Sequence, residues 1–169
     1  LDLEAWERGT SVYFADQVVP MLPRELSNGI CSLNPRVDRL ALSCVMTLTP
    51  EGEVVDHTIA KSVIRTTERM TYEDCNALLA HSDPALAERY ARILPMLEDM
   101  AALSRVLEGR RRRRGALELD TRESYVVCDD SGTPVDVVLR TPGISEGLIE
   151  SFMLAANECV AEHLNRLDK

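Results

Sequence analysis

Several kinds of catalytic site are missing from this sequence. It has no P-loop, no Gly-x-Ser-x-Gly, no Gly-x-Gly-x-x-Gly and no His-Glu-x-x-His spacing. Its five cysteines are spread widely without a Cys-x-x-Cys pair, and its three histidines are far apart. A zinc site is therefore not predicted, and no residue is assigned as a metal ligand. Because the cysteines are odd in number and scattered along the chain, we expect them to be reduced thiols in a cytoplasmic protein.

Aromatic residues and long apolar runs are also scarce. Aromatic side chains make up only 4% of the chain, so its core must depend on aliphatic residues and methionine. No apolar run approaches the roughly 20 residues that cross a bilayer, and the first residues do not resemble a signal peptide. We therefore expect no membrane partner. The chain starts with Leu1 rather than methionine, and we expect it to be a piece of a longer protein.

The charge balance points away from a general nucleic-acid-binding surface. The net charge is −9, yet Arg110, Arg111, Arg112, Arg113 and Arg114 follow one another without a break. Such a run can be a solvated helix end, where cations complement the helix dipole, or a patch that contacts phosphates. Composition alone favours the helix end.

Hydrophobic spacing predicts helices interleaved with hairpins. Strands are expected at 40–48 and 54–64, and again at 125–128 and 135–139. A capping box at Thr71 predicts a short helix, and Asp83-Pro84 opens a longer one that Pro95 should kink or split. Ser145 to Leu167 reads as a last helix with Leu148, Met153 and Val160 on one face. The fold class is therefore α+β with antiparallel β-hairpins.

Four blocks of sequence go further than composition and periodicity. Residues 8–13 read RGTSVY, 20–35 read PMLPRELSNGICSLNP, 113–120 read RRGALELD and 149–158 read IESFMLAANE. In this order they resemble the RNB catalytic domain of the ribonuclease II and ribonuclease R family, and the similarity covers nearly all of the chain.

The resemblance implies an activity for the parent protein. That activity is processive, Mg²⁺-dependent 3′→5′ hydrolysis of single-stranded RNA to nucleoside monophosphates, with no DNA partner expected. In the family, the metal-binding aspartates lie upstream of the segment seen here, and an active-site arginine lies downstream. We therefore expect residues 1–169 to form a partial RNB catalytic domain that is inactive by itself and contains no catalytic residue.

Four residues match substrate-binding positions of the family. Tyr13 matches the tyrosine that stacks on the 3′-terminal base, and Glu150 a glutamate that contacts the terminal nucleotide. Tyr72 matches a residue linked to choosing RNA over DNA, which depends on the 2′-hydroxyl. Leu119 matches a second base-clamping position that is usually phenylalanine, so the clamp is expected either to be looser here or to be completed by another residue. Without the resemblance, Tyr13, Tyr72 and Glu150 would each be interpreted as ordinary structural or surface residues.

Two other hypotheses stay open at this point. The parent could be a non-catalytic RNA-binding or regulatory relative that kept the fold. Alternatively, the acidic balance and the long amphipathic helix would suit a scaffold that binds a protein partner and has no role with RNA.

Overall fold

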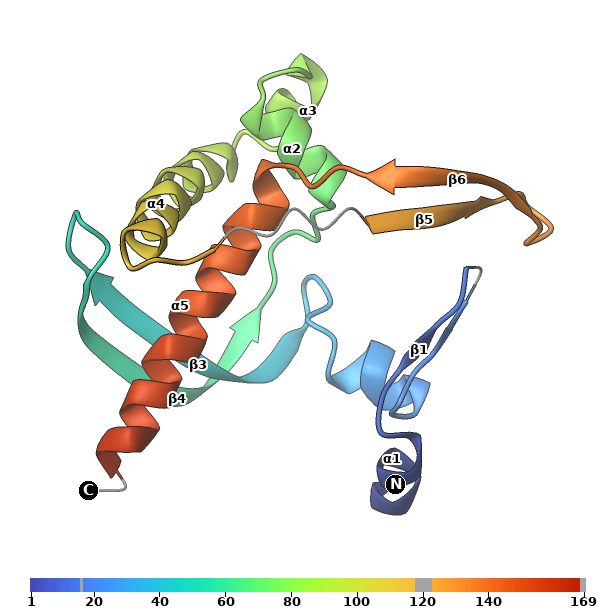
Figure 1. Ribbon diagram of the computed structural model, residues 1–169, viewed down its shortest axis with the longest axis horizontal. Helices are drawn as coiled ribbons and strands as arrows, with labels where there is room; N and C mark the ends of the chain where they lie inside the picture. The colour runs from blue at the N-terminus through green and yellow to red at the C-terminus, as the bar shows by residue number, and fades with distance from the viewer. Residues whose placement is uncertain (16, 118–122, 168–169) are drawn as a thin grey trace. The chain divides into compact units, whose positions relative to one another are not determined.

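The computed structural model describes residues 1–15, 17–117 and 123–167. The chain divides into two compact units, which we describe separately. The first contains residues 1–40, 63–69 and 120–141, and the second contains 41–62, 70–119 and 142–169. Figure 1 labels most of the helices and strands.

The first unit is built from short elements. Helix α1 (Asp2–Arg8) ends at Gly9, whose φ of 65° is the left-handed conformation that suits glycine. Strands β1 (Val12–Tyr13) and β2 (Val18–Val19) form a small antiparallel pair. A larger antiparallel hairpin joins β5 (Glu123–Cys128) to β6 (Pro134–Arg140).

The π-helix η1 (Glu25–Ile30) also belongs to this unit and runs through Asn28 and Gly29. Gly29 is not in the left-handed conformation that ends a helix, so it does not act as a stop there.

A long β-hairpin contributes residues to both units. Strands β3 (Asp38–Leu48) and β4 (Val54–Arg65) pair with each other. Their turn contains Gly52, with a φ of 84°. A Cβ added to Gly52 would lie 3.0 Å from Cγ1 of Val106, so the turn packs closely on the helix that carries Val106. Glycine is needed here both for its backbone angle and for this close approach.

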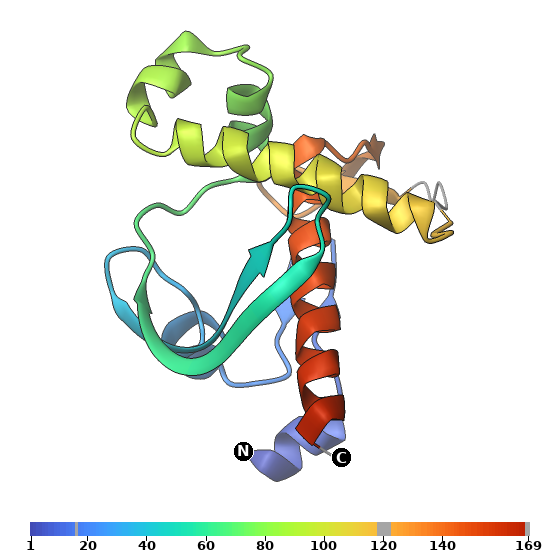
Figure 2. The same cartoon turned by 90° about the vertical axis from the view of Figure 1, so that its left-hand side faces the viewer.

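Four helices form most of the second unit. Helix α2 (Tyr72–Leu79) begins as predicted, with the hydroxyl of Thr71 accepting a hydrogen bond from the N–H of Asp74. Helix α3 (Pro84–Arg89) is separated from α4 (Leu94–Arg113), which has Pro95 in its first turn, so the predicted split occurs. Helix α5 (Ile144–Leu167) packs against α4, which runs across it in Figure 2.

The core of the second unit is small. Leu78, Tyr90 and Leu97 form its buried cluster. On α5 the buried residues are Ser145, Leu148, Ser151 and Cys159. Met153, by contrast, is 60% exposed. The face predicted for this helix was therefore partly wrong, because serine and cysteine can pack where two helices approach closely.

Helices and antiparallel strand pairs alternate along the chain, which confirms the α+β class. Within the described ranges, no helix combines the length and apolar character needed to cross a membrane.

Candidate functional site

A groove of about 720 Å³ lies between α4 and α5 in the second unit, and we call it the α4–α5 groove. Its volume falls within the range of roughly 300–1,000 Å³ that is usual for ligand pockets. Its charged and apolar lining comes from both helices and the segments beside them. The main lining side chains are Arg105, Glu108, Arg111, Arg112, Leu117, Ile144, Glu150 and Leu154.

Glu150 and Arg111 meet across this groove. An Nη1 atom of Arg111 lies 3.3 Å from Oε1 of Glu150, and the Glu150 side chain stays 65% exposed. Glu150 precedes the buried Ser151, so its own side chain projects from the rim of the helix contact rather than into it. The structure thus brings together two of the residues singled out from the sequence.

The arginine run forms the last turn of α4 and its cap. Arg114 donates two hydrogen bonds to Glu158, at 2.7 and 3.2 Å, and Arg112 pairs with Glu108 at 2.8 Å. The bond from Arg114 lowers the pKa of Glu158 below its usual value, and the nearby charges of Arg110 and Arg111 add to this effect. Part of the run therefore joins α4 to α5.

A smaller pocket of about 160 Å³ lies beside the Arg114–Glu158 pair. Its polar lining includes Arg110, Arg111, Arg114, Glu158 and Glu162. Because the cations outnumber the carboxylates there, Arg110 and its neighbours keep a net positive surface beside the α4–α5 groove.

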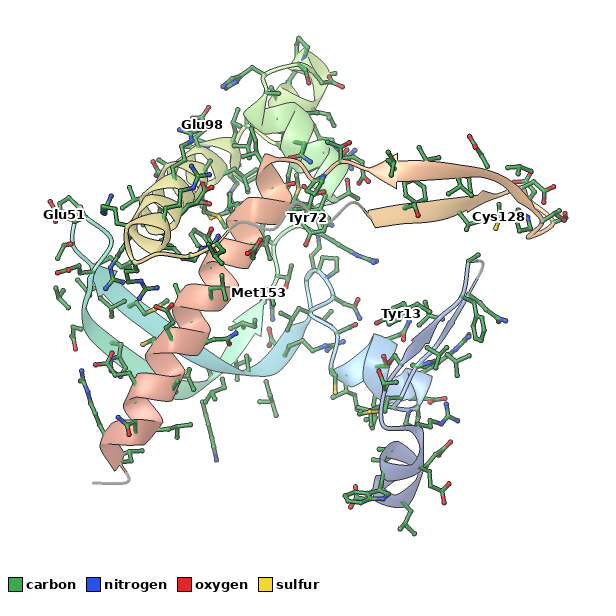
Figure 3. The ribbon with its side chains drawn as sticks, in the orientation of Figure 1. Tyr13, Glu51, Tyr72, Glu98, Cys128 and Met153 are labelled. Atoms are coloured by element: carbon green, nitrogen blue, oxygen red, sulfur yellow. The ribbon has the colours of Figure 1, made fainter. Side chains whose placement is uncertain are left out.

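Tyr72 starts α2 and is tied to the start of α5. The hydroxyl of Ser145 donates a hydrogen bond to the backbone carbonyl of Tyr72 at 3.2 Å. The Tyr72 side chain is 41% exposed, and Figure 3 shows it beside the first turn of α5. Tyr72 and Glu150 therefore belong to two helices that are directly bonded to each other.

Tyr13 lies in the first unit. It pairs with Val18 in the β1–β2 ladder, and its residue is 76% exposed. An exposed ring on a short strand is free to stack on a ligand. The family resemblance predicts that Tyr13 and Glu150 contact the same end of the RNA. Because the two residues belong to different units, this stays a prediction. Leu119, the fourth predicted substrate contact, lies outside the described residues.

The described residues do not form an evident metal site. Within 1–15, 17–117 and 123–167, no three His, Cys, Asp or Glu side chains converge as metal ligands would. These residues therefore do not fit the Mg²⁺ ion that the family resemblance implies, and we assign none of them to it.

Comparison with known proteins decides the family. The RNB domain model matches residues 1–169. This chain belongs to the RNB domain family. It is 54% identical over 163 residues to ribonuclease R 1 of Lactococcus lactis, an alignment that covers 96% of this chain and 20% of that protein. The chain thus spans about a fifth of the length of this relative.

Solved RNB structures share the fold. Mycoplasma genitalium RNase R in complex with ribose-methylated single-stranded RNA matches with a TM-score of 0.89 at 28% identity, over 99% of this chain and 26% of that one. The same protein in complex with double-stranded RNA matches with a TM-score of 0.90, over 99% and 29%. Yeast Ssd1, described as a pseudonuclease, has the fold at 20% identity and a TM-score of 0.66, over 95% and 19%.

The sequence alone did not reveal four polar residues of this part of the RNB chain. Asn76, Glu146, Arg105 and Glu158 were not singled out, although all of them bind or line the contact between the helices. Only Glu158 carried a signal, because it closes the IESFMLAANE block.

Proposed function

We propose that this chain is the RNA-binding part of the catalytic domain of a 3′→5′ exoribonuclease, which acts on single-stranded RNA. The observation that carries the proposal is the α4–α5 groove, where Glu150 lies beside several arginine side chains. The match to the RNB domain family supports interpreting this groove as an RNA-binding site. That the M. genitalium relative was solved with RNA supports the same class of ligand.

The chemistry of the groove suits the end of a nucleic acid strand. Arg105, Arg111 and Arg112 supply cationic donors for phosphate oxygens, and Leu154 supplies an apolar surface for a base. A guanidinium has five N–H donors, so Arg111 can hold Glu150 and still donate to a phosphate.

Glu150 gives a physical reason for selecting the 3′ end. A carboxylate only accepts hydrogen bonds, and its two oxygens can accept from two neighbouring hydroxyls. Only the 3′-terminal nucleotide of an RNA strand has both its 2′- and 3′-hydroxyls free. We propose that Glu150 accepts hydrogen bonds from this pair of hydroxyls.

The two tyrosines would read other parts of the strand. In this proposal Tyr72 senses the 2′-hydroxyl that separates RNA from DNA, and the exposed ring of Tyr13 stacks on a terminal base. Stacking on an aromatic ring tolerates any base, as processive degradation requires, and contributes roughly 1–3 kcal/mol per base.

Hydrolysis is assigned to the parent protein. We propose that the parent needs Mg²⁺, that the ligands of the ion come from outside residues 1–169, and that these residues alone release no nucleotides.

The test uses the full-length parent and a single-stranded RNA labelled at its 5′ end. We expect Mg²⁺-dependent shortening from the 3′ end to a short labelled product, and loss of the reaction with EDTA. Glu150→Ala should slow this shortening, whereas Glu162→Ala, further along α5, should not. RNA binding without cleavage would contradict the proposal and favour a non-catalytic relative, as described for Ssd1.

A further inference from the structure

One polar joint connects the helix of Tyr72 to the helix of Glu150. Asn76 of α2 uses both ends of its side-chain amide. Its Oδ1 accepts from the N–H of Ser145 at 2.9 Å, and its Nδ2 donates to Oε2 of Glu146 at 3.1 Å. Ser145 is 4% exposed, so the joint is shielded from water on that side.

Asn76 acts as the missing cap of α5. The residue before this helix is Gly143, which has no side chain to accept a hydrogen bond from the first turn. The amide oxygen of Asn76 takes that role from a different helix. A Cβ on Gly143 would lie 2.2 Å from Nδ2 of Asn76, so glycine at this position leaves the space that Asn76 occupies.

Glu146 completes the joint. Its Oε2 also accepts from the N–H of Gly143 at 2.9 Å. It lies 3.1 Å from Oγ of Ser145, whose single hydroxyl hydrogen it shares with the carbonyl of Tyr72. The hydrogen bond from the N–H of Gly143 to Glu146 is typical of a capping box, in which a glutamate at the third helical position accepts from the N–H of the residue before the helix. Burial acts to raise the pKa of Glu146, but the hydrogen bonds from Asn76, the backbone and Ser145 together lower it, so the carboxylate stays ionised at neutral pH.

The joint lies one helical turn from each proposed RNA contact. Tyr72 is four residues before Asn76 on α2, and Glu150 is four residues after Glu146 on α5. Residues four apart share a helix face and are about 6 Å apart along the axis. The backbone of Tyr72 is also held directly by Ser145.

From this geometry we infer that Asn76 and Glu146 are positioning residues, which fix the spacing of Tyr72 and Glu150 and so determine how the enzyme recognises the terminal ribose of RNA. The inference rests on the proposed function. Neither residue touches the substrate; each acts through the helix that it anchors. If α2 and α5 shifted relative to each other, Tyr72 would move away from Glu150, and the two residues could no longer contact the same terminal ribose.

The experiment compares variants of the full-length parent on two oligonucleotides. One is all RNA, and the other has 2′-deoxyribose in its 3′-terminal nucleotides. The readouts are kcat and KM on each substrate and the ratio of the two kcat/KM values, with hydrogen–deuterium exchange of 70–89 and 141–166 to follow folding.

We expect Asn76→Ala to lower kcat/KM on RNA by about tenfold, the size expected for one lost buried hydrogen bond to a charged group. It should change the value on the deoxy substrate much less, so the preference for RNA falls. Asn76→Asp places a second carboxylate beside Glu146 and should have a similar effect. In the double variant Asn76→Asp with Glu146→Gln, the new side-chain amide at position 146 can donate a hydrogen bond to the new carboxylate at position 76. Part of the preference for RNA over the deoxy substrate should then return.

Three results would contradict the inference, and they show whether the proposed function fails with it. If Tyr72→Ala and Glu150→Ala reduce the preference for RNA but Asn76→Ala does not, the inference is wrong and the proposed function stands. An equal loss on both substrates, with faster exchange of both helices, would show a purely structural joint and also overturn it. If Tyr72→Ala and Glu150→Ala leave both substrates unaffected, the proposed function fails and the inference falls with it.

Discussion

Arg114 and Glu158 join the end of α4 to the middle of α5 through two hydrogen bonds, at 2.7 and 3.2 Å. A paired geometry of this kind is the strongest arrangement that an arginine and a carboxylate adopt. It places an ion pair at the wall of the smaller pocket, beside the α4–α5 groove. The pair therefore helps to hold together the two helices that carry Arg111 and Glu150.

This pair predicts a pH-dependent contribution to stability. The hydrogen bond from Arg114 lowers the pKa of Glu158, so the folded state holds this proton less tightly than the unfolded state, where a glutamate has a pKa of roughly 4.3. The stabilisation is complete above that value and is lost as pH falls through the lower pKa of the folded state. Glu158→Gln should destabilise the parent by at most about 1 kcal/mol at pH 7, since both side chains are about half exposed.

The measurement is the difference in unfolding between wild type and Glu158→Gln as a function of pH. The difference should shrink towards zero below about pH 4. Glu162→Gln is the matched control, because Glu162 pairs with Arg166 within α5 and does not join two helices. A constant difference from pH 7 to pH 3 would contradict the assignment.

Tyr13 predicts the length of the final product. If its exposed ring stacks on a terminal base, Tyr13→Ala in the parent should weaken the hold on short RNA and lengthen the last undegraded oligonucleotide. Tyr13→Phe keeps the π face and should leave that length as in the wild type. Denaturing gels of 5′-labelled RNA measure the product, and an unchanged length for Tyr13→Ala would rule out the stacking role.

Much of the fold could be read from local patterns, and the site only in part. Thr71, Asp83 and Pro95 act within a few residues of themselves, so their effects on helix ends were predictable. The joint of Asn76 with Gly143 was not, because 67 positions separate them and only tertiary packing brings them together. The same holds for Glu158, which the sequence marks as a family position but does not link to Arg114.

The arginine run offers a test of phosphate binding. Arg110 and Arg113 have no ion pair among the interactions of the described residues, whereas Arg111 and Arg114 pair with α5. If Arg110 or Arg113 contacts a phosphate, its change to Ala should weaken RNA binding and reduce the slope of log K against log salt by about 0.7 per lost contact. Fluorescence titration of the parent with oligo(A) at several salt concentrations measures this slope. A slope that neither variant changes would leave these two arginines as a solvated helix end.

Cys44 and Cys159 test how the β3–β4 hairpin packs on α5. Their Sγ atoms lie 3.6 Å apart, and a disulfide needs about 2.05 Å, so a modest side-chain movement would join them. Burial, and then the neighbouring thiol of Cys44, raise the pKa of Cys159, which disfavours the reactive thiolate. A thiol oxidant such as diamide should therefore link Cys44 and Cys159 slowly at pH 7 and faster at higher pH.

The linked peptides can be detected in tryptic digests of the parent under non-reducing conditions. Peptide 40–61 should be joined to peptide 141–166, and Cys159→Ser should abolish this species. Two outcomes would contradict this packing of the hairpin on α5. In one, Cys44 forms a disulfide with Cys75 instead. In the other, Cys44 and Cys159 stay unlinked after the exposed thiols have been completely oxidised.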